Sequence, residues 1–459
     1  MGAYLLDWLA LFFRWFHVIA GVAWIGASFY FVWLDMSLQK PPEWKAKKGI
    51  SGDLWAVHGG GFYEIAKYKL DPEEMPKTLH WFKWEAYTTW LTGAAMMSIV
   101  YYANATAYLV DPSKVDYGSN IGAIATSILF LLGTYAIYEV IVRSRIGKNK
   151  MTFSITIFIL MIIATWGSYQ LFSDRASFIH VGAILGTIMA GNVFFGIMPA
   201  QRALVDCVRK GEKPGPEVQD LALMARNRSL MNNYFTLPLI FTMISNHYPM
   251  MYSFGDGKGW LVLVFVGVIT ATARHYFNQK HLGHSEPKYL VIPAIATLAL
   301  IFWMRPAPIE PLPVPPVAAA QPVADAAPAV AGAPAVAGAP AVAGAPAVAG
   351  APAVAGAPAV AGAAAVAGAA AAVPVAASSA DDAIIGIVQA KCSVCHMAQP
   401  TQAGFNAPPA GIIIQTPADM KTYQAKIVTA VQTGYMPLGN ITKLTDEERA
   451  QIVAYTSGL

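Results

Sequence analysis

Charged residues are scarce in this chain, and their scarcity is the first indication of its environment. Of the 459 residues, 13% are charged and 56% are hydrophobic. Soluble globular proteins carry about 25% charged residues, so much of this chain is expected to face lipid. The formal net charge of +4 is too small to indicate a nucleic-acid partner.

Cysteines are also few, and the N-terminus lacks the features of a cleaved leader. Cys392 and Cys395 share one motif while Cys207 stands alone, so no intrachain disulfide framework is expected. Residues 1–6 contain no basic side chain, and the apolar run that follows ends without a small-residue cleavage site. We therefore expect a retained first helix rather than a signal peptide.

Long apolar runs recur through residues 1–304. A membrane-spanning helix needs about 20 such residues. Eight segments meet this requirement: 8–36, 82–103, 120–142, 152–172, 176–199, 230–248, 259–277 and 288–304. The sequence therefore predicts an all-α domain of eight transmembrane helices. A Phe-His-Val triplet at 16–18 and an Ile-His-Val triplet at 179–181 favour two four-helix halves, although chance similarity between apolar helices explains them equally well.

Lysine and arginine are concentrated in alternate loops of this domain. The loops after the first, third, fifth and seventh segments are rich in them, whereas 104–119, 173–175 and 248–259 hold one each. The positive-inside rule places the basic loops in the cytoplasm. Eight spans then put both termini on the outer, periplasmic side of a bacterial cytoplasmic membrane.

Residues 305–380 have a different composition. A Pro-rich stretch is followed by a Gly-Ala-Pro-Ala-Val-Ala repeat that begins at Gly332. Such sequence cannot bury a core, and proline interrupts helices, so a semi-extended tether is expected. A flexible chain of this length spans about 50 Å on average. A folded solenoid is the alternative, and the absence of large side chains to stack argues against it.

The strongest motif is Cys392-Ser393-Val394-Cys395-His396, which has the C-x-x-C-H spacing of haem c attachment. Two thiols one helical turn apart reach the two vinyl groups of haem, and the adjacent histidine lies under the iron. A thioredoxin-like or zinc site is disfavoured because no second Cys/His pair follows.

A second axial ligand is expected downstream, and Met436, followed by a proline, supplies a thioether about 40 residues later. His/Met ligation leaves no open position on the iron, which suits electron transfer. Residues 381–459 are similar to a small α-helical class I cytochrome c, with a final helix opened by a capping box at Thr445 and Glu448. By that likeness, a carbonyl near Pro408 or Pro409 accepts the ring N–H of His396. Haem c is attached on the periplasmic side, in agreement with the predicted topology.

Polar residues inside the predicted spans are candidates for function, because burying them in lipid is costly. His17, His180 and His247 fall toward the outer ends of their helices. Two of them could bind a haem b or another metal as a second redox centre; alternatively, each hydrogen-bonds a neighbouring group. Further candidates are Glu85, Glu139, Asn192 and Arg274. At 58–61, His-Gly-Gly-Gly either forms a turn or lets backbone amides approach a ligand.

Three stretches of the membrane domain carry a family resemblance. They are Trp-Phe-His at 15–17 with Ala-Trp-Ile-Gly at 23–26, His-Gly-Gly-Gly-Phe-Tyr at 58–63, and Trp-Phe-Lys-Trp-Glu-Ala-Tyr at 81–87. With the fused C-x-x-C-H domain, the chain resembles the bacterial membrane-bound urate hydroxylases over residues 1–304 and 381–459. The tether is not part of that pattern.

The resemblance implies oxidation of urate to 5-hydroxyisourate in purine breakdown. The hydroxyl would come from water, and two electrons would leave through haem c to a respiratory acceptor such as a soluble cytochrome c or a terminal oxidase. Under this hypothesis His58, Glu85 or a helix histidine accepts the proton. Two other functions stay open, namely a membrane-anchored electron carrier or quinol oxidoreductase, and a transporter or haem-handling protein with the cytochrome as sensor.

Overall fold

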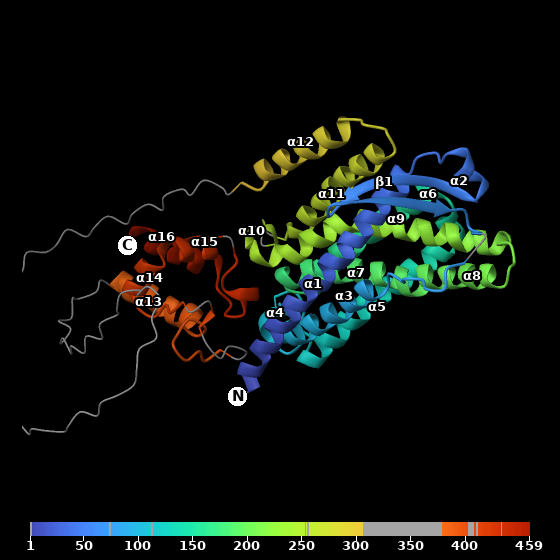
Figure 1. Ribbon diagram of the computed structural model, residues 1–459. Helices are drawn as coiled ribbons and strands as arrows, with labels where there is room; N and C mark the ends of the chain where they lie inside the picture. Colours follow the sequence, from blue (N-terminus) through green and yellow to red (C-terminus); the bar gives the residue numbers. More distant parts are fainter. Residues whose placement is uncertain are drawn as a thin grey trace, which may run out of the picture. The chain divides into compact units, whose positions relative to one another are not determined.

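The computed structural model describes residues 2–72, 75–111, 113–252, 254, 257–305, 379–402, 408–409, 412–432 and 434–459. These residues form a large helical domain up to residue 305 and a small helical domain from residue 379 (Figure 1). The predicted tether, 305–380, lies almost wholly outside the described residues.

Helices occupy all eight ranges predicted to span the membrane. They are α1 (Gly2–Ser37), α3 (Trp84–Met96), α5 (Asn120–Arg143), α6 (Lys150–Leu171), α7 (Asp174–Gly191), α9 (Pro216–Ile244), α11 (Gly259–His281) and α12 (Lys288–Trp303). Within the described residues, five segments are long and apolar enough to cross a bilayer: 8–37, 120–143, 150–171, 174–209 and 259–281. The chain therefore has the helices of a multi-pass membrane protein, and the full count of eight spans stays a prediction.

Three consecutive helical segments form one continuous helix. α7 continues through a π-helical turn, η3 (Asn192–Ile197), into α8 (Met198–Arg209). Most residues of α7 are buried, and it packs against α9, α6 and α5, so it is the central helix of the bundle (Figure 1). A second π-helical turn, η1 (Met97–Tyr102), extends α3. Such turns widen the helix locally and are frequent at functional sites.

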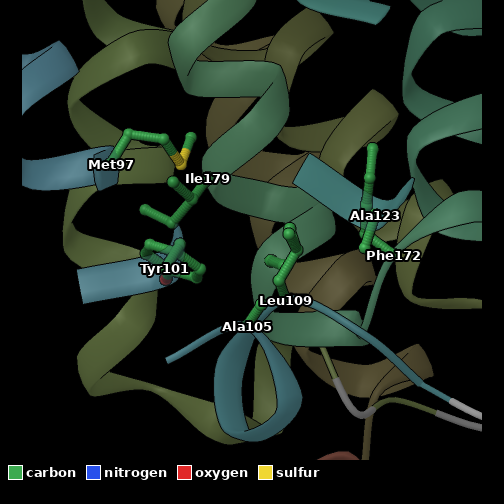
Figure 2. Packing of buried hydrophobic residues seen from close by; sticks show 8 residues of the cluster. Met97, Tyr101, Ala105, Leu109, Ala123, Phe172 and Ile179 are labelled. Atoms are coloured by element: carbon green, nitrogen blue, oxygen red, sulfur yellow. The ribbon is translucent and has the colours of Figure 1, made fainter. Parts of the chain in front are cut away.

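The core at one end of the bundle joins segments distant in sequence. Met97 and Tyr101 of η1, Leu109, Phe172 and Ile179 pack into one buried cluster (Figure 2). In contrast, large apolar side chains on α12 and α1 are exposed, for example Leu298 at 66% and Trp15 at 62%. An outward apolar surface of this kind is expected where a helix faces lipid rather than water.

The all-α prediction missed a β-hairpin between α1 and α3. Strands β1 (Ile50–His58) and β2 (Gly61–Tyr68) pair antiparallel, with His58 opposite Gly61. The turn residues Gly59 and Gly60 both have positive φ, 57° and 81°. A two-residue hairpin turn requires this conformation, which glycine adopts without strain. These glycines are therefore explained by the turn.

A buried lysine anchors the hairpin. Lys45 lies in α2 (Glu43–Lys47), is 4% exposed, and forms ion pairs with Asp53 of β1 and Glu64 of β2. The hydrogen bond to Asp53, followed by that to Glu64, raises the pKa of Lys45 above its ordinary value. The charged lysine thus fixes the hairpin to the short helix that precedes it.

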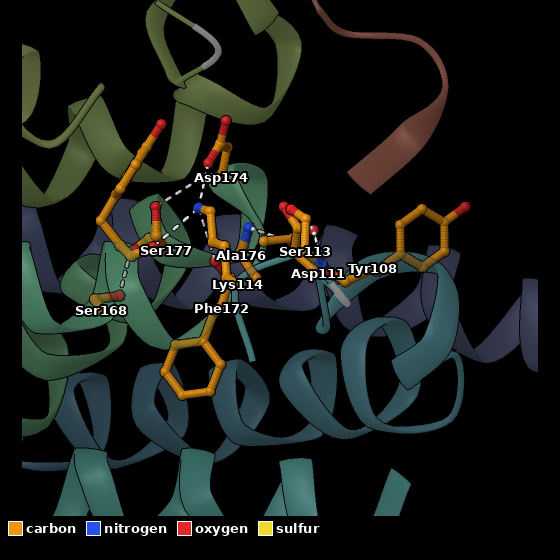
Figure 3. Close-up of polar contacts among 11 residues, drawn as sticks. Tyr108, Asp111, Ser113, Lys114, Ser168, Phe172, Asp174, Ala176 and Ser177 are labelled. Carbon is orange, nitrogen blue, oxygen red and sulfur yellow. Dashed lines mark hydrogen bonds and ion pairs between the residues drawn. The ribbon is translucent and has the colours of Figure 1, made fainter. Parts of the chain in front are cut away.

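The loop before α5 is fixed by another lysine (Figure 3). Lys114 donates to the carbonyl oxygens of Tyr169 and Phe172 at 2.9 and 3.2 Å and pairs with Asp174 at 2.5 Å. It therefore satisfies carbonyl groups at the C-terminal end of α6, where a cation is favoured. This explains the single basic residue of an otherwise acidic and polar loop.

The small domain is built from α13 (Ser379–Val388), the π-helical turn η5 (Gln389–Ser393), α14 (Pro417–Thr422), α15 (Gln424–Gln432), the 3₁₀ turn η7 (Leu438–Asn440) and α16 (Asp446–Gly458). Its core contains Val388, Ile414, Met420, Ile427, Val431, Leu444, Ile452 and Val453. The capping box predicted at Thr445 and Glu448 is confirmed. Cys392 of η5 packs against this core, and Lys391 donates to the carbonyl oxygens of Thr442 and Lys443 before α16.

Candidate functional site

The C-x-x-C-H motif forms one compact turn at the end of η5. The backbone N–H groups of Cys395 and His396 both donate to the Cys392 carbonyl, at 3.1 and 2.9 Å. Cys395 and His396 are buried, at 9% and 8% exposure. Ser393 Oγ donates to the Ile414 carbonyl at 2.6 Å, which joins the turn to the segment before α14. The two thiols and the imidazole therefore lie within a single turn.

The orientation of His396 is set by a backbone carbonyl. Its Nδ1–H donates to Ile412 at 2.9 Å, which leaves Nε2 as the nitrogen that could ligate a metal. The expected acceptor near Pro408 or Pro409 was therefore wrong in its residue, because the Pro409 carbonyl instead accepts the N–H of Ile412 at 3.1 Å. Burial lowers the pKa of His396, only partly opposed by the hydrogen bond to Ile412, and this favours the neutral ring that iron requires.

The two thiols have the character of buried apolar groups. Burial, with the neighbouring Cys395 as a smaller cause, raises the pKa of Cys392 to about 12, and burial also raises the pKa of Cys395. Both thiols are therefore protonated at neutral pH.

The loop that carries Met436 is held by an arginine. Arg449 of α16 donates to the carbonyl oxygens of Val431 and Met436 at 2.6 and 2.7 Å. The N–H of Met436 donates to Ala430 at 2.9 Å. The backbone of the proposed axial ligand is thus fixed on both sides. A covalently attached haem c fits this set of groups, which comprises an imidazole with one free nitrogen, a methionine whose backbone is restrained, and two neighbouring thiols, of which that of Cys395 is buried.

A buried ion pair joins α9 to α5 in the membrane domain. Arg228 of α9 is 1% exposed, and its two terminal nitrogens donate to the two carboxylate oxygens of Glu139, each at 2.9 Å. Asn192 Oδ1 accepts from Arg228 at 3.0 Å and from the Tyr138 hydroxyl at 2.9 Å. Asn192 belongs to η3, so the π-helical turn aims this amide into the network.

Arg228 falls between the predicted fifth and sixth spans, 176–199 and 230–248, and so counts among the basic residues of a predicted cytoplasmic loop. It lies instead inside a helix, and the sequence signal that could have shown this is weak. Gly196, four residues after Asn192 in η3, leaves room for the arginine, since an added Cβ would stand 2.4 Å from Arg228 Cδ. The Arg228–Glu139 ion pair is bidentate and is supported by Asn192, so we interpret it as structural.

A second buried arginine, Arg274 of α11, has a different environment. It is 6% exposed, its Nε donates to Asn233 Oδ1 at 2.8 Å, and its guanidinium lies 4.0 Å from the centre of the Phe29 ring. Asn233 comes from α9 and Phe29 from α1. Nearby, the Tyr234 hydroxyl and His275 Nδ1 are hydrogen-bonded at 2.7 Å. Arg274 thus lies where α1, α9 and α11 meet.

The three candidate haem b histidines do not come together. His180 is fully buried; its Nδ1 donates to the Ala176 carbonyl and its Nε2 accepts from Ser127, both at 2.7 Å. His17 bonds Thr92 at 3.0 Å, and His247 is exposed at the end of η4 (Ser245–His247). Since both nitrogens of His180 are engaged, ligation would break one bond. These contacts do not favour a haem b, which stays a prediction.

The proposed proton acceptors are separate as well. His58 is exposed at the end of β1, beside the hairpin turn. Glu85 lies in the first turn of α3, and its Oε2 is buried with no hydrogen-bond partner among the described residues. Their catalytic roles stay predictions, and Glu85 is the better placed of the two because one of its carboxylate oxygens is buried without a hydrogen-bond partner among the described residues.

Comparison with known proteins identifies the membrane domain. The family model described as urate oxidase N-terminal matches residues 3–305, about two thirds of the chain. No curated protein and no solved structure matches. The match ends where the predicted tether begins.

Proposed function

The chain belongs to the urate oxidase N-terminal family, which indicates a urate-related oxidoreductase, and from this premise we propose that it hydroxylates urate at the membrane. The product is 5-hydroxyisourate, in purine catabolism. The electrons leave through haem c on the C-terminal domain, residues 381–459, to a respiratory acceptor on the periplasmic side. The observation that carries the proposal is a urate-family membrane domain on the same chain as a C-x-x-C-H turn.

The proposed reaction balances without oxygen. Urate and one water give 5-hydroxyisourate, two protons and two electrons. Haem c, attached at Cys392 and Cys395 with His396 and Met436 as axial ligands, would supply one-electron redox chemistry. The chain itself must bind the urate anion, exclude bulk water and accept a proton. Glu85, whose Oε2 has no hydrogen-bond partner among the described residues, is the candidate base.

The test is anaerobic reduction of the oxidised, full-length holoprotein by urate, followed through the α band of reduced haem c. Since urate yields two electrons and each haem takes one, half an equivalent of urate should reduce the haem fully. The double replacement Cys392→Ala/Cys395→Ala should abolish the signal, whereas Cys207→Ala, which removes the cysteine outside the motif, should leave it intact.

Failure of this reduction has a defined meaning. If urate leaves the haem oxidised while dithionite reduces it, urate is not the electron donor. Reduction by a quinol under the same conditions would then establish the membrane-anchored electron carrier instead. Reduction by neither donor would leave both redox functions without support.

A further inference from the structure

The two buried arginines of the membrane domain differ in how their charge is balanced. Arg228 is neutralised by the bidentate Glu139 carboxylate, with both contacts at 2.9 Å. Arg274 is almost as buried, at 6% exposure, yet across the described ranges no carboxylate pairs with it. Its hydrogen bond there goes to the neutral amide of Asn233. A buried charge without a counter-ion is unfavourable unless a ligand supplies one.

Two amides beside Arg274 also have polar atoms without a regular hydrogen bond. Asn233 and Asn278 are 0% and 2% exposed. The Nδ2 of Asn233 has no hydrogen-bond partner in the described part of the chain. The polar atoms of Asn278 make no hydrogen bond of regular geometry there, although the Tyr234 hydroxyl is near enough to interact with this amide. Buried amides are nearly always hydrogen-bonded, so each unsatisfied group requires an explanation. Asn233 therefore has a free amide donor, and Asn278 has a donor and an acceptor that make no hydrogen bond of regular geometry. Both amides lie near the Arg274 guanidinium, which has no carboxylate partner among the described residues.

The three side chains converge from two helices. Arg274 and Asn278 are four residues apart on α11, so they project from the same face, one turn from each other. Asn233 comes from α9 and holds Arg274 through Nε, the inner nitrogen of the guanidinium. The Phe29 ring from α1 covers the guanidinium at 4.0 Å. The Nη edge of Arg274 carries no protein hydrogen bond within the described residues and is the edge left for a ligand.

We propose that Arg274, Asn233 and Asn278 bind the substrate of the proposed reaction, the urate anion. Urate is planar, carries one negative charge, and presents carbonyl oxygens next to ring N–H groups. A guanidinium supplies the charge and parallel donors, and an asparagine amide matches the alternating acceptors and donors of the ring edge. The site rests on the proposed function for the identity of its ligand.

The decisive variant is Asn278→Asp. At this position, four residues from Arg274 on one helix, the new carboxylate would pair with the guanidinium in place of the ligand. The site therefore predicts two opposite effects in one variant: urate binding falls at least 100-fold, while thermal stability rises. Arg274→Gln, which removes the charge, should weaken binding about 10- to 100-fold. Lys280→Gln removes an exposed cation from the same end of α11 and serves as the matched control, with unchanged binding.

Binding is measured by equilibrium dialysis of radiolabelled urate against the oxidised, full-length holoprotein, and stability by thermal unfolding. If Asn278→Asp binds urate as tightly as the parent, or loses stability together with binding, the site is refuted. Co-purification of anionic phospholipid that Arg274→Gln abolishes, with unchanged urate binding, would instead assign the arginine to a lipid phosphate and overturn the proposal.

The outcomes separate the site from the function. A parent protein that binds urate but is not reduced by it would refute the redox reaction and retain the site. A protein that is reduced by urate, with Arg274→Gln binding urate normally, would retain the function and refute the site.

Discussion

Replacing Glu139 by glutamine should destabilise the membrane domain more than replacing its partner Arg228 by methionine. The carboxylate accepts both terminal nitrogens of Arg228, each at 2.9 Å, and the arginine is 1% exposed. Removing one partner of a buried ion pair leaves an uncompensated charge, at a cost of about 3–5 kcal/mol. Glutamine still accepts a hydrogen bond, so we expect about 3 kcal/mol.

Replacing Arg228 instead leaves the Glu139 carboxylate, whose charge is still balanced by a neighbouring cation. Without Arg228, Glu139 keeps Arg143, whose Nε lies 2.6 Å from its Oε1, and its side chain is 17% exposed. Arg228→Met should therefore cost about 1–2 kcal/mol. In the double variant the stranded arginine is gone, so Glu139→Gln should add little to Arg228→Met. The coupling energy between the two sites is then about 2 kcal/mol or more.

The assay is thermal unfolding of the purified holoprotein in detergent, for the parent, both single variants and the double variant. A variant with Arg143→Gln, which removes an exposed partner of Glu139, is the matched control and should change stability by less than about 1 kcal/mol. The reasoning is refuted if the two single effects simply add, or if Arg228→Met proves the more damaging change.

Three further predictions concern other parts of the chain. Arg449→Ala removes two hydrogen bonds that restrain Met436, so we expect a lower reduction potential and a weaker thioether–iron absorption band, measured by redox titration and optical spectroscopy. Gly196→Ala places a Cβ 2.4 Å from the Cδ of the buried arginine and should cost about 1–3 kcal/mol in thermal unfolding. The backbone N–H of Gln415, followed by the hydroxyl and N–H of Thr416, lowers the pKa of the Asp419 carboxyl. The ionised carboxylate therefore stabilises the small domain at neutral pH, and this stabilisation is lost as the pH falls below about 4, which circular dichroism would follow.

Each of these three predictions would be contradicted by a specific result. An unchanged potential in Arg449→Ala would show that the loop holds Met436 without the arginine. Normal stability of Gly196→Ala would mean that the arginine yields to a methyl group at no cost. For Asp419, the variant Asp419→Asn should flatten the acid-induced loss, and an identical pH profile in that variant would remove the carboxylate from the explanation.

The local features of this fold were readable from sequence because short-range physics sets them. Apolar runs of spanning length predicted where the helices lie, and Thr445 with Glu448 predicted the start of α16. The C-x-x-C-H spacing likewise predicted a single turn with His396 beside the thiols. Each of these depends on residues within one or two helical turns.

The features that were missed depend on contacts between distant segments. Arg228 pairs with Glu139, 89 residues away, so its charge looked like a loop residue until the fold brought the two together. The β-hairpin at 50–68 is anchored by Lys45 from outside the strands. The ring N–H of His396 donates to Ile412 rather than to the expected proline carbonyl, and the Pro409 carbonyl accepts the N–H of Ile412 in a local turn.

The π-helical turn at Asn192–Ile197 has a consequence for how the long central helix can be altered. One extra residue per turn rotates everything beyond it by about 100°, the angle of one residue in a helix with 3.6 residues per turn. The segments Asp174–Gly191 and Met198–Arg209 therefore present their side chains in two different rotational frames. Deleting a single residue within η3 would restore a regular helix and turn the whole of α8 against its neighbours, so this helix tolerates substitutions far better than changes of length.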